Sequence, residues 1–351
     1  MFGFSPRRVV VPRPAGGSQR WQRSGQALAR RAVRVRELIR ETADAVTLVL
    51  ETEDGRPLAF RAGQYLTHCF EIGGAPVKRA YSLSAPEGGA LACTIKCVRG
   101  GQVSDYVTRV LKPGDRYFIL GPSGDLTLDE KDEGPLVFLA GGSGITPVMG
   151  LIETALARKP DRFVKLVYAS RSPEETIFAA RLDALRAKHR SLEIEFVHSA
   201  AQGRLDAAGA ARRLHRDYAS YYLCGPEGLM AAAGHGLRAL GVPAEKIRRE
   251  RFLAAAQPAA QRPTAPQEIV FRRFHRVVTQ QPGETMLDAA LREGLPLPFS
   301  CTVGGCASCK LRVAEGRVAL NEPNCLSSEE KAAGFTLACS AYALERVVVE
   351  G

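Results

Sequence analysis

Apolar and polar residues alternate with a period of two over the part of the chain that begins near Ala32. Short apolar runs such as Val46–Leu50 are separated by turn residues such as Asp54-Gly55. This alternation predicts half-buried strands, and several short strands at this spacing predict a β-barrel or a β-sandwich. We therefore expect an antiparallel β domain over residues 32–132.

The pattern then changes to short buried strands that alternate with helices. Pro135–Ala140, Val164–Tyr168 and Tyr221–Cys224 are typical of buried strands, and helical segments are expected at 148–156 and 174–189. Strands that alternate with helices predict a parallel sheet whose ligand site lies at the carboxyl ends of the strands. We expect an α/β domain over residues 133–253.

A third domain is expected over residues 268–351. It follows residues 254–267, a stretch rich in Pro and Ala that predicts a semi-extended linker. Residues 284–294 have the spacing of a short amphipathic helix, and Leu295–Ser300 then leads into a loop rich in cysteine.

The charge is concentrated at the amino terminus of this chain of 351 residues, whose net charge is +11. The first 36 residues hold nine arginines and no acidic residue. Either they form a basic patch for an acidic partner or an anionic membrane surface, or residues 1–31 are a flexible, solvated leader. Interrupting Pro, Gly and Ser residues favour the leader. A basic tail without a binding motif argues against a nucleic-acid partner.

No secretory signal is visible in the sequence. The longest uncharged run, residues 134–152, contains three glycines near its centre together with Pro147, so it predicts a strand, a loop and a helix and not a membrane span. We expect a cytoplasmic protein and a monomer.

Four cysteines have the spacing of an iron–sulfur site: Cys301, Cys306, Cys309 and Cys339, separated by four, two and twenty-nine residues. This spacing is typical of plant-type [2Fe–2S] clusters, whose two irons need four thiolates. Structural zinc usually takes two short pairs of cysteines, and disulfides need an oxidising compartment, so both alternatives are weaker. The five other cysteines form no second ligand set.

Two stretches of the first domain suit a ligand that has a diphosphate and a flat ring system. On a strand, Arg79 and Tyr81 share one face, so a guanidinium can fork onto a diphosphate while a ring stacks on a flat ring system. Downstream, Gly100-Gly101 precedes a helix for which Ser104 is the expected N-cap, and a helix start after paired glycines is an anion site.

The second domain carries a glycine loop directly after its first strand. Gly141-Gly-Ser-Gly-Ile-Thr-Pro147 leads into a helix, with Thr146 as the expected N-cap, and makes a pyrophosphate cradle. It departs from the GxGxxG fingerprint. The last strand of the domain ends at Cys224-Gly225-Pro226.

Taken together, these motifs resemble the ferredoxin–NADP reductase superfamily. The resemblance covers residues 32–351 and is to the single-chain reductases of oxygenases, diiron enzymes and desaturases, including the phenylacetyl-CoA epoxidase type, which carry a carboxyl-terminal plant-type ferredoxin domain. It implies an FAD-binding β-barrel, an NAD(P)-binding α/β domain and an α+β ferredoxin domain of the β-grasp type.

The resemblance also implies roles for individual residues. Those expected to bind FAD are Arg79, Tyr81, Ser82, Gly101, Val103 and Ser104. Those expected to bind the nicotinamide nucleotide are Gly141, Gly142, Gly144, Thr146, Ser170, Arg171, Gly225 and Pro226. Tyr81 would stack on the flavin, Ser82 would lie near flavin N5, and Cys224 would lie beside the nicotinamide; these three are the candidate catalytic residues. An arginine at position 171 can meet a 2′-phosphate, so we expect NADPH, with NADH as the alternative.

The implied function is an electron-transfer reductase. Hydride would pass from the nucleotide to FAD, and single electrons would pass through the [2Fe–2S] cluster to a diiron or Rieske oxygenase, or to a desaturase. Two alternatives remain open from the sequence: a stand-alone reductase of small acceptors such as quinones or ferric chelates, and a redox sensor, against which the complete hydride-transfer motifs argue.

Overall fold

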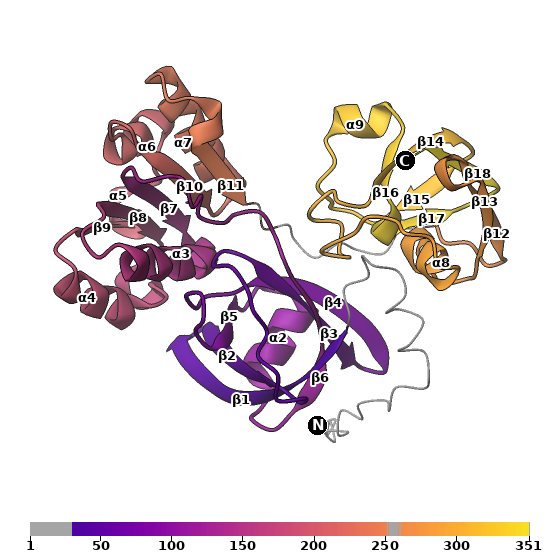
Figure 1. Cartoon of the computed structure of the whole chain (residues 1–351), viewed down its shortest axis with the longest axis horizontal. Helices are drawn as coiled ribbons and strands as arrows, with labels where there is room; N and C mark the ends of the chain where they lie inside the picture. The colour runs from indigo at the N-terminus through magenta and orange to yellow at the C-terminus, as the bar shows by residue number, and fades with distance from the viewer. Residues whose placement is uncertain (1–29, 251, 253–258, 260, 351) are drawn as a thin grey trace.

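The computed structural model describes residues 30–250, 252, 259 and 261–350. Almost all of the expected leader and part of the expected linker lie outside this range. Three sheets follow one another along the chain, each in its own region of the molecule (Figure 1). The expected boundaries after residues 132 and 253 stay predictions.

The first sheet is antiparallel and has the order β4-β3-β6-β1-β2-β5. Its strands are β1 Arg31–Thr42, β2 Ala45–Thr52, β3 Tyr65–Ile72, β4 Ala75–Ser82, β5 Leu91–Lys96 and β6 Arg116–Ser123. A bridge between Leu83 and Cys93 brings the β4 and β5 edges together, so the sheet closes into the expected barrel. Helix α2 (Gln102–Arg109) caps the barrel by burying Val103 and Val107 in its core. We call this part the barrel domain.

The second sheet is parallel throughout and has the order β11-β10-β7-β8-β9. Its strands are β7 Leu136–Gly141, β8 Val164–Ser170, β9 Leu192–His198, β10 Ser220–Cys224 and β11 Ile247–Glu250. Its helices are α3 Ile145–Arg158, α4 Ala179–Lys188, α5 Ser199–Gln202, α6 Ala207–Leu214 and α7 Glu227–Ala239. This α/β domain confirms the expected architecture.

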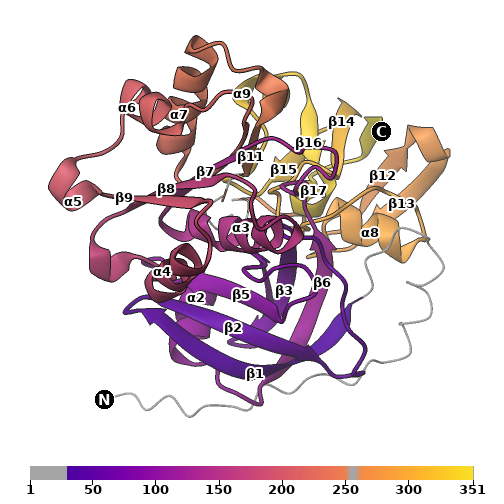
Figure 2. The same ribbon diagram turned by 60° about the vertical axis from the view of Figure 1, so that its left-hand side comes forward.

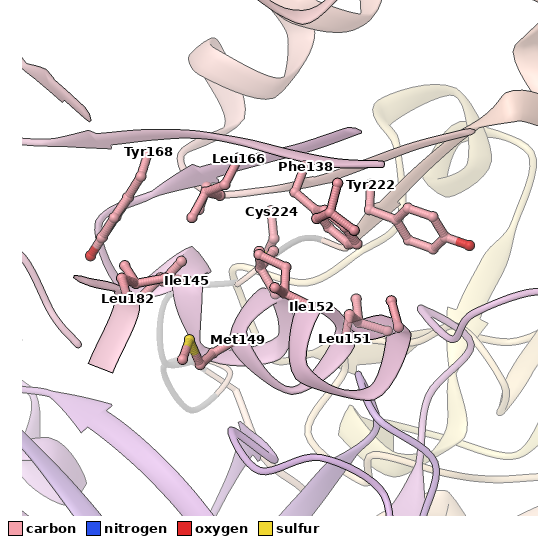
Figure 3. Close-up of a cluster of buried hydrophobic side chains, with 14 of the residues drawn as sticks. Phe138, Ile145, Met149, Leu151, Ile152, Leu166, Tyr168, Leu182, Tyr222 and Cys224 are labelled. Atoms are coloured by element: carbon pink, nitrogen blue, oxygen red, sulfur yellow. The ribbon is translucent and has the colours of Figure 1, made fainter. Parts of the chain in front are cut away.

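Alternate residues of β7 enter two separate cores. Phe138 packs with residues of α3 and α4 on one face of the sheet, whereas Val137 and Leu139 pack with residues of α6 and α7 on the other. In the α3-side core, Cys224 lies among Phe138, Leu166 and Ile152 (Figure 3).

Helix α3 also joins the α/β domain to the barrel. It lies between the two sheets (Figure 2), and Gly150 approaches the barrel so closely that a Cβ there would come within 2.5 Å of the Ala85 carbonyl oxygen. The backbone of Glu87 donates to Thr154 Oγ1 at 3.1 Å across the same boundary.

The third sheet has the order β13-β12-β18-β14-β16, and a two-stranded sheet β15-β17 accompanies it. The strands are β12 Gln267–Phe271, β13 Arg276–Gln280, β14 Lys310–Glu315, β15 Val318–Leu320, β16 Phe335–Leu337, β17 Ala341–Ala343 and β18 Val347–Glu350. The helices are α8 Met286–Arg292 and α9 Ser328–Ala332. In this carboxyl-terminal domain the helix expected within 284–294 is confirmed, and a capping box of Thr285 and Asp288 starts it.

Three local expectations about helix starts are wrong. Helix α2 begins at Gln102 with Gly101 as N-cap, so Ser104 lies inside the helix. Helix α3 begins at Ile145, which places Thr146 in its first turn. Helix α4 begins at Ala179 and not near Glu174, because Phe178 has a left-handed backbone (φ 63°) that precedes the helix.

Within the described residues, the helices are too short or too polar for any of them to span a bilayer.

Candidate functional site

One cleft is lined by all three domains. It has a volume of about 930 Å³, and its walls include Arg79 and Ser82 of the barrel domain, Glu250 of the α/β domain, and Cys301 and Cys306 of the carboxyl-terminal domain. Residues expected to serve the flavin and residues expected to hold the cluster therefore meet in one space.

Ser82 and Glu250 meet where the barrel and the α/β domain join. The Ser82 hydroxyl donates to Glu250 Oε2 at 3.3 Å, and both side chains are buried or nearly so. Parallel pairing of β10 with β11 aligns Cys224 with Glu250 at the carboxyl ends of these strands. The three polar groups thus gather at the edge of the sheet where ligands of α/β folds bind.

Burial controls the protonation of this group. It raises the pKa of Glu250 to about 7, helped by the negative charge of Asp125 and opposed by the Ser82 hydrogen bond. Burial and the charge of Glu250 hold the pKa of the Cys224 thiol well above its usual range, so Cys224 stays a neutral thiol. A carboxyl that titrates near neutrality can hold or release a proton at this edge.

The flavin motif lies on β4. The Arg79 guanidinium donates to its neighbour's carbonyl, Lys78 O, at 2.6 Å and makes no ion pair with a described carboxylate, so its charge is available for an anion. Burial lowers its pKa, although Tyr81 opposes this. The Tyr81 ring meets the His68 ring edge-on, with 5.4 Å between ring centroids. A diphosphate and a flat ring system fit this strand.

At the start of α2, the Ser104 side chain packs against Gly101 and bonds to the preceding loop. Ser104 Oγ accepts from the Val98 amide at 3.1 Å and donates to the Gly101 carbonyl at 3.1 Å. A Cβ on Gly101 would come within 2.5 Å of Ser104 Oγ. Both residues therefore shape the loop that opens onto the helix start, and Val103 lies in the barrel core. None of the three lines the three-domain cleft.

The glycines after β7 have two different surroundings. A Cβ on Gly144 would come within 2.1 Å of the Cys224 carbonyl oxygen, and one on Gly141 within 2.7 Å of Pro226 Cδ. These two glycines let the β7 and β10 loops touch. Gly142 has φ of +52°, and a Cβ there would meet no atom within 4 Å. Gly142 is therefore the one of the three that opens onto space a nucleotide can fill.

Ser170 at the end of β8 and Arg171 after it also differ in their surroundings. Ser170 is buried, and its hydroxyl bonds to Thr176 Oγ1 at 2.9 Å and to the Ser172 carbonyl at 3.1 Å, so it shapes the loop. The Arg171 side chain is 78% exposed and lies 3.9 Å from Glu175, which leaves it accessible to a nucleotide.

Backbone amides surround the expected cluster cysteines. The amides of Val303 and Gly305 donate to Cys301 Sγ at 3.5 and 3.2 Å, and the Cys301 amide donates to Cys306 Sγ at 3.4 Å. Left-handed backbone at Thr302, Gly304 and Ala307 (φ 53°, 77° and 59°) turns the loop so that these amides converge. Such donors stabilise thiolates, as a [2Fe–2S] cluster requires.

The four thiols form a chain of contacts. Cys301 raises the pKa of Cys306, with burial adding to the effect. Cys301 lowers the pKa of Cys339, but Cys309 and burial raise it further, to about 12. Among the described residues no three His, Cys, Asp or Glu side chains are placed to hold a single metal ion. Interactions that run from Cys306 through Cys301 and Cys339 to Cys309 bring four thiols together, as a group with two irons requires, so the residues present fit the cluster.

Sequence reasoning assigned no role to three residues of this site. Glu250 is brought to Ser82 by strand pairing, and Tyr65 and Thr67 contact the cysteine loop from β3. The sequence around Glu250 holds one signal, a carboxylate at the end of a short, partly exposed strand. Nothing local distinguishes Tyr65 and Thr67 from other strand residues.

Family models match the three domains in turn. The oxidoreductase FAD-binding domain matches residues 32–128, the oxidoreductase NAD-binding domain residues 138–235, and the 2Fe-2S iron-sulfur cluster binding domain residues 272–344.

Two relatives match this chain over most of their length. The chain is 31% identical to a subunit of the 1,2-phenylacetyl-CoA epoxidase of Escherichia coli, covering 88% of this chain and 94% of the relative. It is 33% identical to the ferredoxin reductase component of 3-ketosteroid-9-alpha-monooxygenase of Mycobacterium tuberculosis, covering 88% and 91%. The solved structure of phthalate dioxygenase reductase superposes with a TM-score of 0.66 at 22% identity, covering 91% of this chain and 97% of that one, which shows a shared fold.

Proposed function

Because this chain belongs to the ferredoxin reductase-type flavoproteins with a carboxyl-terminal [2Fe–2S] domain, we propose that it supplies electrons from NADPH to a diiron or Rieske oxygenase, or to a desaturase. It is an NAD(P)H oxidoreductase that uses FAD and a [2Fe–2S] cluster.

The observation that carries the proposal is the cleft shared by all three domains. Ser82 and Glu250 lie on one side of it and Cys301, Cys306 and Cys339 on another. When bound, the flavin and the cluster supply the conversion between two-electron and one-electron chemistry. The chain's own residues hold these groups in reach of each other and exclude water between them.

Individual residues have separate tasks in this proposal. Arg79 holds the FAD diphosphate and Tyr81 stacks on the flavin ring, while Ser82 and Glu250 hold a proton at the edge of the ring. Cys224 packs beside the nicotinamide as a neutral thiol. Cys301, Cys306, Cys309 and Cys339 hold the cluster. We also propose a monomer, and a weak contact of the basic leader with a membrane surface near the acceptor.

Arg171 is the residue proposed to select the nucleotide. Its exposed guanidinium can bind a 2′-phosphate, which NADPH has and NADH lacks. A charge-assisted hydrogen bond contributes about 1.5–3 kcal/mol, so Arg171→Ala should weaken NADPH binding at least about tenfold and leave NADH binding unchanged. Arg186→Ala, which removes another exposed arginine of the α/β domain, is the control.

The test is an anaerobic absorption titration of the purified protein with NADPH and NADH in separate runs. We expect flavin and iron–sulfur bands that both bleach, with NADPH the better reductant. A well-loaded sample without iron–sulfur bands would exclude the relay, and equal responses to both nucleotides would exclude the role of Arg171.

A further inference from the structure

We propose that Thr67, supported by Tyr65, is a positioning residue that seats the cluster loop on the barrel for electron transfer from the flavin. The Thr67 hydroxyl donates to the Cys301 carbonyl oxygen at 2.8 Å, and Tyr65 Oη lies 2.8 Å from Ser300 Oγ. These bonds join segments far apart in the sequence and end on a proposed cluster ligand and on the residue before it.

Both bonds come from one face of β3. Side chains alternate along a strand, so Tyr65 and Thr67 point to the face opposite Leu66 and Phe70, which fill the barrel core. The outer face of a barrel strand normally meets water, yet Thr67 is 1% and Tyr65 8% exposed. Cys69, next on this face, is only half-buried. The contact is therefore local to the end of β3 that carries Tyr65 and Thr67.

This end of β3 adjoins the flavin motif. Thr67 pairs with Ala80 and Tyr65 pairs with Ser82 in the antiparallel ladder between β3 and β4. Neighbouring strands lie about 4.8 Å apart, so the residue that holds the cluster loop is one strand away from those proposed to hold the flavin. The carboxyl-terminal domain lies over this side of the barrel in Figure 1.

The Tyr65 ring packs against the backbone of Gly124. Gly124 lies so close that a Cβ there would come within 3.0 Å of Tyr65 Cδ1 and Cε1. Gly124 also has φ of +113°, a conformation that side chains disfavour. The glycine thus provides the space in which the ring stands, and the ring presents its hydroxyl to Ser300.

The contacts of Thr67 and Tyr65 with the cysteine loop would set the distance between the flavin and the cluster. The rate of electron tunnelling through protein falls steeply with distance. Electron transfer from the flavin to the cluster should therefore slow when the cysteine loop moves away from Thr67 and Tyr65. When bound, the flavin and the cluster would supply the one-electron transfer, and Thr67 and Tyr65 would hold the loop that carries Cys301 in place for it. The Thr67 proton stays on its oxygen, and no covalent bond changes.

The inference rests on the proposed ligand role of Cys301, and its test uses the full-length protein with both cofactors. Thr67→Val keeps the branched shape but removes the hydroxyl, whereas Thr67→Ser keeps the hydroxyl. Tyr65→Phe removes the second hydroxyl without changing the ring. Stopped-flow absorption after mixing with NADPH resolves flavin reduction from cluster reduction, and hydrogen–deuterium exchange reports on residues 300–306 directly.

In Thr67→Val we expect cluster reduction to slow about fivefold, the change that corresponds to a net hydrogen bond of about 1 kcal/mol. Flavin reduction should keep its rate, exchange at residues 300–306 should accelerate, and Thr67→Ser should restore both properties. Tyr65→Phe should shift them in the same direction.

Unchanged cluster reduction and exchange in both Thr67→Val and Tyr65→Phe would overturn the inference while leaving the proposed function intact. Equal slowing of flavin and cluster reduction would also overturn it, because Thr67 would then act on the barrel itself. Missing iron–sulfur bands in the unaltered protein would instead refute the proposed function.

Discussion

Glu250 is the residue whose chemistry depends most on its surroundings. An ordinary glutamate is ionised at neutral pH, but burial beside Ser82 and Cys224 raises the pKa of Glu250 to about 7. The carboxyl is therefore protonated below this pH and can donate to Ser82, whereas above it the carboxylate accepts from Ser82.

Glu250 should make flavin reduction depend on pH. We expect the rate to fall about tenfold as the pH rises through about 7, because the ionised carboxylate puts a negative charge beside the position proposed to receive a hydride. Glu250→Gln keeps the shape without the charge, so its rate should stay high on both sides of this pH. Stopped-flow flavin reduction by NADPH across this range measures the effect.

The control is Glu245→Gln, which changes an exposed glutamate near the start of the same strand. It should keep the pH profile of the unaltered protein. A profile that survives in Glu250→Gln would assign the titration to another group.

At the scale of elements, two loops of the parallel sheet pack closely because one of them carries glycines, which have no side chain, at the points of contact. Gly144 lies against the Cys224 carbonyl and Gly141 against Pro226, so the ends of β7 and β10 come closer than any other residue would allow. This contact holds the backbone of Cys224, which strand pairing aligns with Glu250.

Gly144→Ala should disturb this contact directly. Its Cβ would lie 2.1 Å from the Cys224 carbonyl oxygen, and overpacking of this kind costs about 1–3 kcal/mol. We expect a lower melting temperature and weaker NADPH binding, measured by thermal unfolding and fluorescence titration. Gly228→Ala on α7 is the comparison, because a Cβ there meets no atom within 4 Å and alanine favours a helix by about 0.5–1 kcal/mol. Equal melting temperatures for the two variants would contradict this packing.

The elements also show what sequence can predict and what it cannot. The three sheets and their order follow from hydrophobic periodicity, and the cysteine loop and the β7 glycine loop are local in sequence. Ser104 and Thr146 look like N-caps by type, but each helix starts earlier in the chain, directly after Gly101 and Gly144. The contacts of Tyr65 and Thr67 depend on domain contact, which no local pattern encodes, and the carboxylate of Glu250 reaches Ser82 only through strand register and domain contact.

At the scale of the whole molecule, the domains form a route with a defined order. Hydride transfer is proposed for the junction of the barrel and the α/β domain, and the proposed cluster cysteines Cys301, Cys306 and Cys339 line the same cleft. One-electron acceptors that react at the flavin and acceptors that need the cluster should therefore respond differently to loss of the cluster.

Cys306→Ser tests this order. It removes a proposed cluster ligand, so iron–sulfur absorption and cytochrome c reduction should fall at least about tenfold, since loss of even a supporting group at a metal site costs about 10–100-fold. Ferricyanide reduction at the flavin should persist. Cys325→Ser is the matched control, because Cys325 is a half-buried cysteine of the same domain outside the proposed ligand set. Loss of the cluster in Cys325→Ser, or of ferricyanide reduction in Cys306→Ser, would contradict the assignment.

The bond from Thr67 to Cys301 has a consequence for interchange between reductases. Thr67 donates to a main-chain carbonyl, which every amino acid possesses. This hydrogen bond therefore does not depend on which side chain the loop carries at that position. The Tyr65 contact does require a particular side chain, because it involves the hydroxyl of Ser300. A chimaera that joins this barrel to a foreign ferredoxin domain would need to keep the backbone path of the cysteine loop and a single serine, which makes the carboxyl-terminal domain an exchangeable module.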